Sequence, residues 1–241
     1  MENKVVVITG GSSGAGEALA YRFSSEGFNV VIGGTNLERL KKVQSKIQSS
    51  GSKCEYIVHD VSLEREVKKM IGHTIKSYGR LDVLICNAGH GDFQALENFS
   101  SKQISKFINL NLISHIILCR HLVSYMKAKG NGDIIVIGSE ASLAGKKKAT
   151  LYSAAKFGLR GFTQALRDEC SNTGVRVCLI NPGFVRSPFF DSLNFKPGDA
   201  ENNAIETDDI AKIVCDIIKT RQGTIIDEIN ISPASKSIIF K

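Results

Sequence analysis

Short apolar runs alternate with longer segments of helical period along most of the chain. The runs are rich in Val and Ile and show little alternation between apolar and polar positions, which is typical of parallel strands buried on both faces. We expect such strands at Val5–Thr9, Asn29–Gly33, Lys53–His59, Asp82–Cys86, Asp133–Gly138, Val175–Asn181 and Thr224–Ile231.

The segments between these runs have the spacing of amphipathic helices. One apolar stripe consists of Leu63, Val67, Met70, Ile71, Ile75 and Tyr78. Ser100 and Gln103 form a capping-box pattern at the start of a helix expected to run to about Lys129. Thr207, followed by two aspartates that suit the helix dipole, is expected to cap another helix.

Strand–helix alternation of this kind predicts an α/β fold, a doubly wound parallel sheet of about seven strands with helices on both faces, known as the Rossmann fold. No repeat or Pro/Gly/Ser-rich linker divides the chain, so we expect a single domain over residues 1–241. Ligands of such sheets bind beyond the carboxyl ends of the strands, where the strand order reverses. The residues that follow each strand are therefore the candidates for chemistry.

Composition narrows the class of protein. The 241 residues are 42% hydrophobic and 23% charged, which is typical of globular domains. No run approaches the ~20 apolar residues of a membrane helix, and the apolar run at the amino terminus is too short for a signal peptide. The six cysteines (Cys54, Cys86, Cys119, Cys170, Cys178 and Cys215) show no C-x-x-C pair or zinc-like spacing. We expect a cytoplasmic protein with reduced thiols and no metal site.

The net charge of +7 permits attraction to anions such as phosphorylated cofactors, nucleic acid or acidic lipid. Basic residues are spread along the chain, apart from Lys146-Lys147-Lys148, and no nucleic-acid-binding module is present. We therefore expect a small-molecule substrate and no nucleic-acid partner.

A glycine-rich turn, TGGSSGAG, follows the first expected strand and precedes a helical segment at Glu17–Glu26. Gly10, Gly14 and Gly16 permit a tight turn and let the backbone approach a pyrophosphate at the helix amino terminus. Taken alone, the turn is a weak signal, because a tight strand–helix connection can have the same glycines without binding a nucleotide. Its spacing resembles the nucleotide loop of the short-chain dehydrogenase/reductase family, in its single-domain type of about 250 residues.

Further motifs extend this resemblance over nearly the whole chain. They are Asp60-Val61 after the third strand, CNAG at Cys86–Gly89, Asn111 in the long helix, Ser139 after the fifth strand, YSAAK at Tyr152–Lys156, Asn181-Pro182-Gly183 and Ser187. The resemblance implies a nicotinamide cofactor held by Gly10, Ser12, Ser13, Gly14, Gly16, Thr35, Asn36, Arg39, Asp60, Val61, Asn87, Ala88, Gly89, Tyr152, Lys156, Pro182, Gly183, Val185 and Ser187. Cys86 departs from the family's first asparagine, which we expect to be a packing change in a buried strand.

The resemblance also implies catalysis by Asn111, Ser139, Tyr152 and Lys156. Reduction of a carbonyl needs a hydride from the cofactor and a proton for the developing alkoxide. Tyr152 is the expected acid, and Lys156, on the same helical face, would favour the phenolate. Ser139 can hydrogen-bond the substrate oxygen, and Asn111 in this family helps hold a proton-relaying water. A nucleotide-sensing or scaffold protein without turnover is the alternative, although a sensor has no need of the proton relay.

The end of the second strand bears on the choice of nicotinamide. A carboxylate there would select NAD by binding the ribose 2′-hydroxyl, but Gly34 occupies that place. Thr35 and Asn36 can bind a phosphate, and Arg39 lies one helical turn on. NADP(H) is favoured, and NAD(H) stays open as the alternative.

Residues 184–206 resemble the family's substrate-covering segment. Its apolar residues Phe184, Phe189, Phe190, Leu193 and Phe195 predict an apolar roof over the substrate. The lysines at 146–148 border the same site in the family and could attract an anionic substrate, although a solvated basic loop is the favoured explanation. The family's dimers and tetramers imply a homodimer or homotetramer formed through the helix from Ser101 to Lys129 and the segment Leu151–Asn172.

Overall fold

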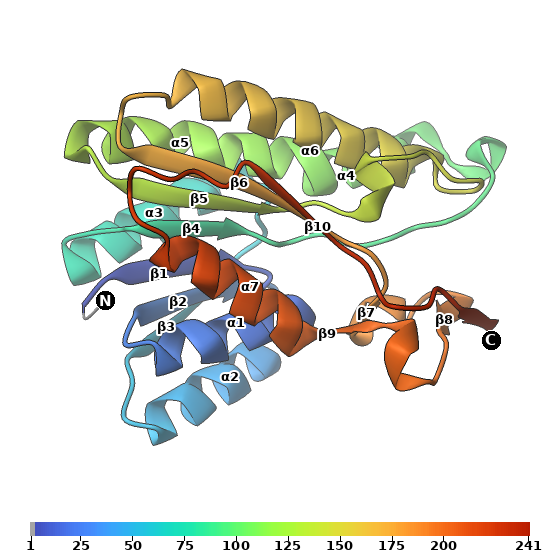
Figure 1. Cartoon of the computed structure of the whole chain (residues 1–241), viewed down its shortest axis with the longest axis horizontal. Helices are drawn as coiled ribbons and strands as arrows, with labels where there is room; N and C mark the ends of the chain where they lie inside the picture. The colour runs from blue at the N-terminus through green and yellow to red at the C-terminus, as the bar shows by residue number, and fades with distance from the viewer. Residues whose placement is uncertain (1–2) are drawn as a thin grey trace.

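A seven-stranded parallel sheet forms the centre of the molecule in the computed structural model, which describes residues 3–241 (Figure 1). Its strands, in spatial order, are β10 (Glu228–Ile231), β6 (Val175–Pro182), β5 (Gly132–Ile137), β4 (Val83–Cys86), β1 (Val5–Thr9), β2 (Asn29–Gly34) and β3 (Cys54–Val58). The order reverses between β1 and β4, which confirms the fold class and identifies the edge of the sheet where a ligand is expected.

The central strands lack polar alternation because helices cover both sides of the sheet. Every residue of β1, β4, β5 and β6 is buried. The edge strands β3 and β10 are only partly buried. Strand β10 begins at Glu228 instead of the expected Thr224. Residues 221–224 form a turn in which the Thr224 amide donates to the Arg221 carbonyl.

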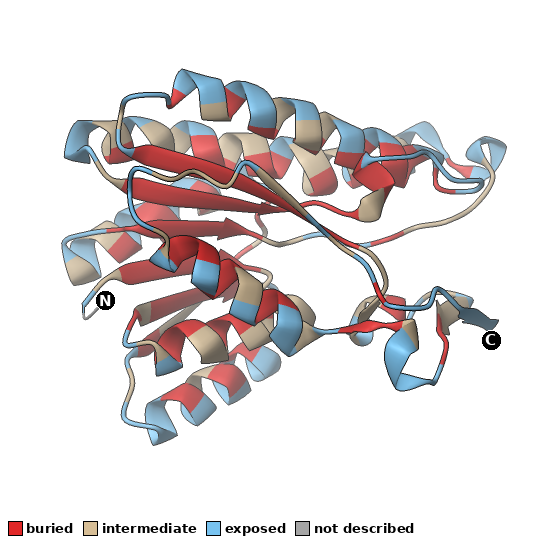
Figure 2. Cartoon of the chain, in the orientation of Figure 1, coloured by how far each residue is buried: buried red, intermediate tan, exposed pale blue. Residues whose placement is uncertain are grey.

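Two helical layers enclose this sheet. Helices α1 (Gly14–Ser25), α2 (Leu37–Ser49) and α7 (Thr207–Lys219) pack on the face that includes Val6 and Ile8. Helices α3 (Glu64–Tyr78), α5 (Ser114–Lys129) and α6 (Thr150–Glu169) pack on the face that includes Val5 and Val7. Figure 2 shows each helix buried toward the sheet and exposed outward, so the hydrophobic effect on both faces holds the layers together.

The long helix expected from Ser100 to Lys129 has an irregular centre. Its capping box is confirmed, since Ser100 accepts from the Gln103 amide and the Gln103 side chain accepts from the Ser100 amide. Helix α4 (Ser101–Ile108) then passes through a π-helical turn, Asn109–Ile113, before α5 begins. Such turns have no hydrophobic signature and often occur at functional sites.

Two details of the expected helices, a cap and a member of an apolar stripe, were wrong. Glu206, rather than Thr207, caps α7, and its side chain forms a capping box with Asp209. Leu63 precedes α3 and is 40% exposed, so it does not belong to the buried stripe that begins at Val67.

The continuous helical segment Ser101–Lys129 is the one among residues 3–241 whose length and composition would allow it to cross a membrane. Its residues Leu118, Leu122 and Met126 are buried in the layer between α3, α6 and the sheet. Core helices of domains outside membranes meet the same length and composition criteria.

Residues 184–206 form a small lobe beside the carboxyl edge of the sheet, at the lower right in Figure 1. It contains β7 (Val185–Arg186) paired with β9 (Ile205–Glu206), and β8 (Phe195–Pro197) paired with the C-terminal β11 (Ile238–Phe240). The chain terminus therefore returns to the lobe.

Candidate active site

The glycine-rich turn after β1 has the backbone its sequence predicts. Gly10 and Gly14 have φ values of 66° and 57°, in the left-handed region that favours glycine. Gly16 lies behind the turn, where an added Cβ would stand 2.2 Å from the Gly10 carbonyl oxygen. The turn and the start of α1 can come together only with glycine at this position.

Hydrogen bonds link the CNAG motif, which follows β4, to this turn. The Asn87 side-chain amide donates to the carbonyl oxygens of Thr9, at 3.0 Å, and Gly10, at 3.3 Å. The Thr9 hydroxyl accepts from the amides of Asn87 and Ala88, at 3.0 and 3.2 Å. These bonds cross the point where the strand order reverses and fix the two loops relative to each other.

A cavity of about 950 Å³ opens at this edge of the sheet. All four expected catalytic residues lie on its wall. The wall also includes most of the expected cofactor contacts: Gly10, Ser12, Ser13, Gly14, Thr35, Arg39, Asp60, Val61, Asn87, Ala88, Gly89, Pro182, Gly183, Val185 and Ser187. Gly16 lies behind the wall, and Asn36 caps α2 by accepting from the Arg39 amide at 3.0 Å.

The end of the cavity beside β2 and β3 fits an adenosine. Asp60 accepts from the Ser62 hydroxyl at 2.6 Å and from its amide at 2.9 Å, and these bonds keep the pKa of Asp60 below its usual range. His59, which the sequence did not single out, packs so closely on Gly33 that a Cβ there would lie 2.0 Å from its ring. Thr35 and Arg39 line this end.

The glycine-rich turn lies close to residues 184–206 at the centre of the expected dinucleotide site. A Cβ on Gly14 would stand 3.4 Å from the Cβ of Ser187, which is van der Waals contact. The missing side chain widens the space between them, and a turn of positive φ at the start of a helix is a kind of backbone that binds a pyrophosphate. Within residues 3–241, no group of three His, Cys, Asp or Glu side chains is placed to hold a metal ion.

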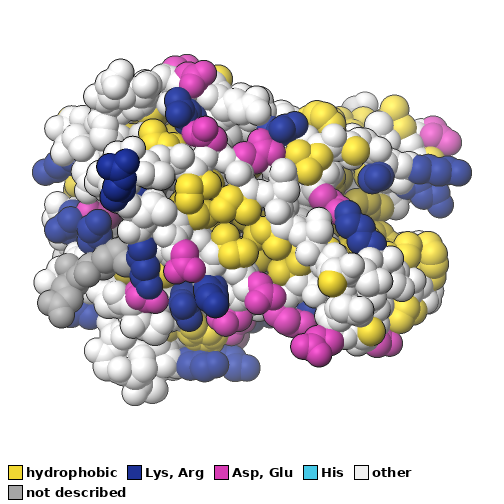
Figure 3. Space-filling view, viewed as in Figure 1, with side chains coloured by type: hydrophobic (Ala, Val, Ile, Leu, Met, Phe, Trp, Pro, Cys, Tyr) yellow, Lys and Arg dark blue, Asp and Glu magenta, His cyan; other side chains and the backbone are white. Residues whose placement is uncertain are grey.

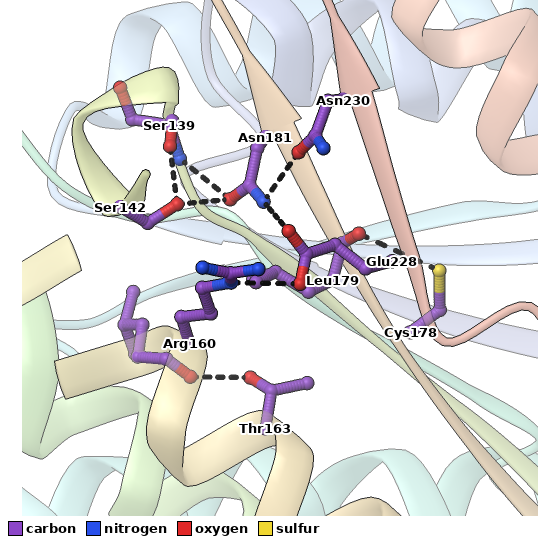
Figure 4. A network of polar contacts seen from close by, with 10 residues as sticks. Ser139, Ser142, Arg160, Thr163, Cys178, Leu179, Asn181, Glu228 and Asn230 are labelled. Carbon is purple, nitrogen blue, oxygen red and sulfur yellow. Dashed lines mark hydrogen bonds and ion pairs between the residues drawn. The ribbon is translucent and has the colours of Figure 1, made fainter. Parts of the chain in front are cut away.

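A polar network behind Ser139 sets its position (Figure 4). The Asn181 side-chain oxygen accepts from the Ser139 amide at 3.3 Å and from the Ser142 hydroxyl at 2.6 Å. The Asn181 amide group donates to Glu228 at 2.9 Å, and Arg160 binds the other oxygen of Glu228 at 2.9 Å. The network joins β5, β6, β10 and α6, so the loop carrying Ser139 is held by long-range contacts.

The Tyr152 side chain is largely buried and packs among aromatic rings. Phe93 and Phe189 pack on its ring, with centroids 5.2 and 6.1 Å away. Burial raises the pKa of Tyr152 to about 12, while a hydrogen bond with the Ser139 side chain acts in the opposite direction and Glu140 raises the pKa further. The phenol therefore keeps its proton until a partner stabilises the phenolate.

Lys156 lies beside this phenol. Its ammonium is 5.7 Å from the Tyr152 ring centroid and donates to the Ile137 carbonyl at 3.0 Å. Burial lowers the pKa of Lys156 to about 8, so its charge titrates close to neutral pH. A cation beside a phenol favours the phenolate form once the proton is given up.

The π-helical turn places Asn111 at the bottom of the cavity. Its side-chain oxygen accepts from the His90 amide at 3.1 Å, and its amide donates to the Phe107 carbonyl at 3.1 Å. Below it, His115 is fully buried and binds the Ala88 carbonyl at 2.8 Å. Burial, with the charge of Lys156 second, lowers the pKa of His115 to about 3, so this residue is a neutral support for the CNAG loop.

The substrate end of the cavity has aromatic walls. Phe184, Phe189, Phe190 and Phe195 of the covering lobe line it, as the sequence predicts, whereas Leu193 is not part of the wall. Phe93 also lines this end, and its ring lies 5.3 Å from that of Phe195 between centroids. No motif in the sequence identifies this residue.

The C-terminal tail closes this end from outside. Lys236 forms an ion pair with Glu140, and Ile238 and Phe240 contribute to the cavity wall. The Lys241 ammonium donates to the Phe190 carbonyl at 2.6 Å. The tail therefore links the covering lobe to the loop that carries Ser139.

Comparison with known proteins agrees with this geometry. The family model for short chain dehydrogenases matches residues 4–197. An uncharacterised oxidoreductase of Staphylococcus saprophyticus is 30% identical over 245 aligned residues, covering 99% of each chain. An alcohol dehydrogenase from the archaeon Thermococcus sibiricus, complexed with 5-hydroxy-NADP, is 27% identical and has a TM-score of 0.88 over 97% of this chain and 98% of that one. A metagenomic short-chain oxidoreductase in complex with NADP is 29% identical, with a TM-score of 0.86 over 98% and 99%.

The chain therefore belongs to the short-chain dehydrogenase family, which confirms the resemblance drawn from its motifs. By this membership it is an NAD(P)-dependent oxidoreductase.

Proposed function

We propose that the protein is an NADP-linked carbonyl reductase, or alcohol dehydrogenase in the reverse direction, with Tyr152 as general acid and base. The observation that carries the proposal is the convergence of Ser139, Tyr152 and Lys156, with Asn111, on one cavity that continues into a dinucleotide cradle. A nucleotide-sensing or scaffold protein would not need a buried phenol paired with a buried ammonium.

The bound nicotinamide supplies the hydride. Ser139 binds the carbonyl oxygen of the substrate, and Tyr152 gives that oxygen its proton as negative charge develops there. Lys156 stabilises the phenolate left behind, and Asn111 holds a water through which the proton is replaced. The phenylalanines around Tyr152 exclude bulk water, which strengthens each of these interactions.

The preference for NADP is supported by the charge at the adenosine end. Gly34 provides no carboxylate to repel a 2′-phosphate, and Arg39 with Thr35 lines the wall there. The two similar structures named above contain NADP or a derivative of it.

The proposed assembly is a homodimer or homotetramer formed through the α4–α6 face. Ile113 in the π turn is 41% exposed and Phe157 in α6 is 45% exposed. Such exposed apolar side chains are common at interfaces between copies of a chain. Light scattering behind a sizing column would measure the assembly, and Ile113→Glu together with Phe157→Glu should shift it toward monomer.

The proposed setting is the cytoplasm, with a small-molecule substrate. All six cysteines are buried free thiols, consistent with a reducing compartment.

The testing experiment is fluorescence titration with NADPH and NADH, followed by a turnover assay on a carbonyl panel. Tighter NADPH binding with turnover supports the proposal. Tight binding without turnover of any panel member favours the sensor, and failure of a folded sample to bind either nucleotide overturns the assigned cradle.

A further inference from the structure

Three consecutive lysines, Lys146 to Lys148, lie on the wall of the cavity at its substrate end. All three are exposed. Their ammonium groups have no carboxylate partner within 4.0 Å among residues 3–241, whereas Lys196 and Lys236 in the neighbouring segments do have one. Three cations without a carboxylate partner therefore lie at the opening of the cavity at its substrate end.

The backbone holds this cluster in an unusual shape. The Ala149 amide donates to the Lys146 carbonyl at 3.0 Å, closing a turn in which Lys148 has a φ of 63°. Glycine or asparagine would adopt this left-handed conformation more easily than lysine. Backbone strain of this kind is concentrated at ligand sites. The strained conformation of Lys148 is therefore consistent with a functional role for this turn.

Nearby negative charge is already neutralised. Glu140 is the acidic residue on the wall near Tyr152, and it is ion-paired with Lys236 of the tail. The other carboxylate on the wall, Asp60, lies at the adenosine end. In Figure 3, Lys and Arg side chains gather at the right-hand end of the molecule, where the segment between β5 and α6 lies in Figure 1. The mouth therefore carries a net positive charge.

The interior between these lysines and the reacting phenol is apolar. Phe93, Phe189 and Phe195 surround the approach to Tyr152. A compound seated with its carbonyl at Tyr152 thus meets aromatic rings first and cationic groups at the opening.

We propose that Lys146, Lys147 and Lys148 form an anion subsite, and that the substrate is a carbonyl compound with an apolar body and a carboxylate or phosphate at its far end. This inference rests on the proposed function and specifies its substrate class. The attraction acts mainly on binding, because the lysines take no part in the proposed transfer of the hydride or the proton.

The test uses ketones that differ only at the far end. The probes are 4-acetylbenzoate and its homologues with two and four methylenes before the carboxylate, each paired with its neutral methyl ester. Calorimetry measures their binding to protein saturated with NADP⁺, a complex in which a ketone cannot be reduced. We expect at least one carboxylate to bind about tenfold more tightly than its ester at low salt, and less so at high salt.

The decisive variant is Lys146→Gln/Lys147→Gln/Lys148→Gln, which should bind each acid and its ester equally. Its matched control is Lys42→Gln/Lys69→Gln/Lys76→Gln, which removes the same charge from exposed positions off the cavity and should keep the preference. Phosphonate analogues of the acids distinguish a phosphate end from a carboxylate end.

Equal binding of acids and esters by the unaltered protein, or failure of every probe to bind, would overturn the subsite. So would a preference that survives in the decisive variant. Failure of the proposed reductase is a separate result: the acid preference would persist in the NADP⁺ complex while no ketone in the panel is turned over with NADPH.

Discussion

The two ends of the cavity are built differently. The nucleotide end is made mainly of backbone and small residues from loops that directly follow β1, β2 and β4. The substrate end is made of side chains from segments far apart in the chain, such as Phe93, Phe189 and Phe240. The first end is specified locally by glycines and short motifs, whereas the second depends on how distant segments fold onto one another.

Apart from loss of the Tyr152 hydroxyl, the largest effect expected at the junction of the two ends is that of Ser139→Ala. In the proposed mechanism Ser139 donates a hydrogen bond to the substrate oxygen, and loss of one such donor typically lowers kcat by about 10²–10³. Steady-state kinetics with a ketone that the unaltered protein reduces measures the fall in kcat, and NADPH affinity is determined on the same samples. A matched loss in Ser142→Ala would show instead that the polar network, rather than the donor itself, carries the effect.

The nucleotide end should be sensitive to a single methyl group. In Gly16→Ala the new Cβ would clash with the Gly10 carbonyl oxygen at 2.2 Å, so the turn must move. We expect NADPH affinity to fall by more than tenfold, measured by fluorescence titration. Gly72→Ala is the control, because nothing lies within 4 Å of the added Cβ.

The control variant Gly72→Ala is itself expected to change the stability of the protein. Gly72 is an exposed residue inside α3, where alanine is a better helix former by about 1 kcal/mol. Gly72→Ala should raise the free energy of unfolding and leave NADPH affinity unchanged. Equal affinity losses in both glycine variants would remove the distinction between a tight cradle and an ordinary helix position.

These glycines also explain why the nucleotide end could be predicted from sequence. Gly10 and Gly14 are needed for their backbone angles and Gly16 for close packing, so local residue type identifies the turn. The strands were equally readable, because burial on both faces gives continuous Val and Ile runs. The π turn at Asn109–Ile113 could not be predicted, since it keeps the apolar pattern of an ordinary helix.

The substrate end was predictable only in part. The aromatic content of residues 184–206 indicated an apolar roof, but nothing in the sequence indicates that Phe93 meets Phe195 or that Lys236 meets Glu140. Such pairs depend on the lobe and tail folding back to the sheet. The cap of α7 was predicted one residue too late. Glu206 and Thr207 are both able to begin a helix, and the backbone geometry decides between them.

At the substrate end, Lys236→Met should change the pH dependence. It leaves the Glu140 carboxylate unpaired, and because Glu140 already raises the pKa of Tyr152, that pKa should rise further. Alcohol oxidation needs the deprotonated phenol, so its pH–rate profile should shift to higher pH and the rate near neutrality should fall severalfold. Lys241→Met is the control, because it removes the contact between the tail and the Phe190 carbonyl and leaves the Glu140 ion pair in place. An equal shift of the pH–rate profile in this variant would contradict the electrostatic explanation.

The smallest effect near neutral pH concerns His115, which supports the nucleotide end. The unfolded chain binds a proton at His115 near pH 6.5, whereas the folded chain does so only near its pKa of about 3. The unfolded state therefore holds more protons within this window, and stability falls as the pH drops from 6.5 toward 3, by up to about 1.4 kcal/mol per pH unit.

His115→Gln keeps a donor for the Ala88 carbonyl and removes the titration. Urea unfolding at pH 7 and pH 5 should show a smaller loss of stability in this variant than in the unaltered protein. Part of the loss should persist, because burial also lowers the pKa of His59. Identical losses in both proteins would show that His115 does not titrate in this range.

The most direct measurement of the proposed chemistry compares Tyr152→Phe with the unaltered protein, with reduction rate and NADPH affinity determined on the same samples. The phenylalanine ring preserves the packing against Phe93 and Phe189 and removes only the proton donor. The expected result is a fall in kcat of about 10²–10⁴ with NADPH affinity unchanged within about twofold. A kcat that stays within about tenfold of the unaltered protein would contradict Tyr152 as the general acid.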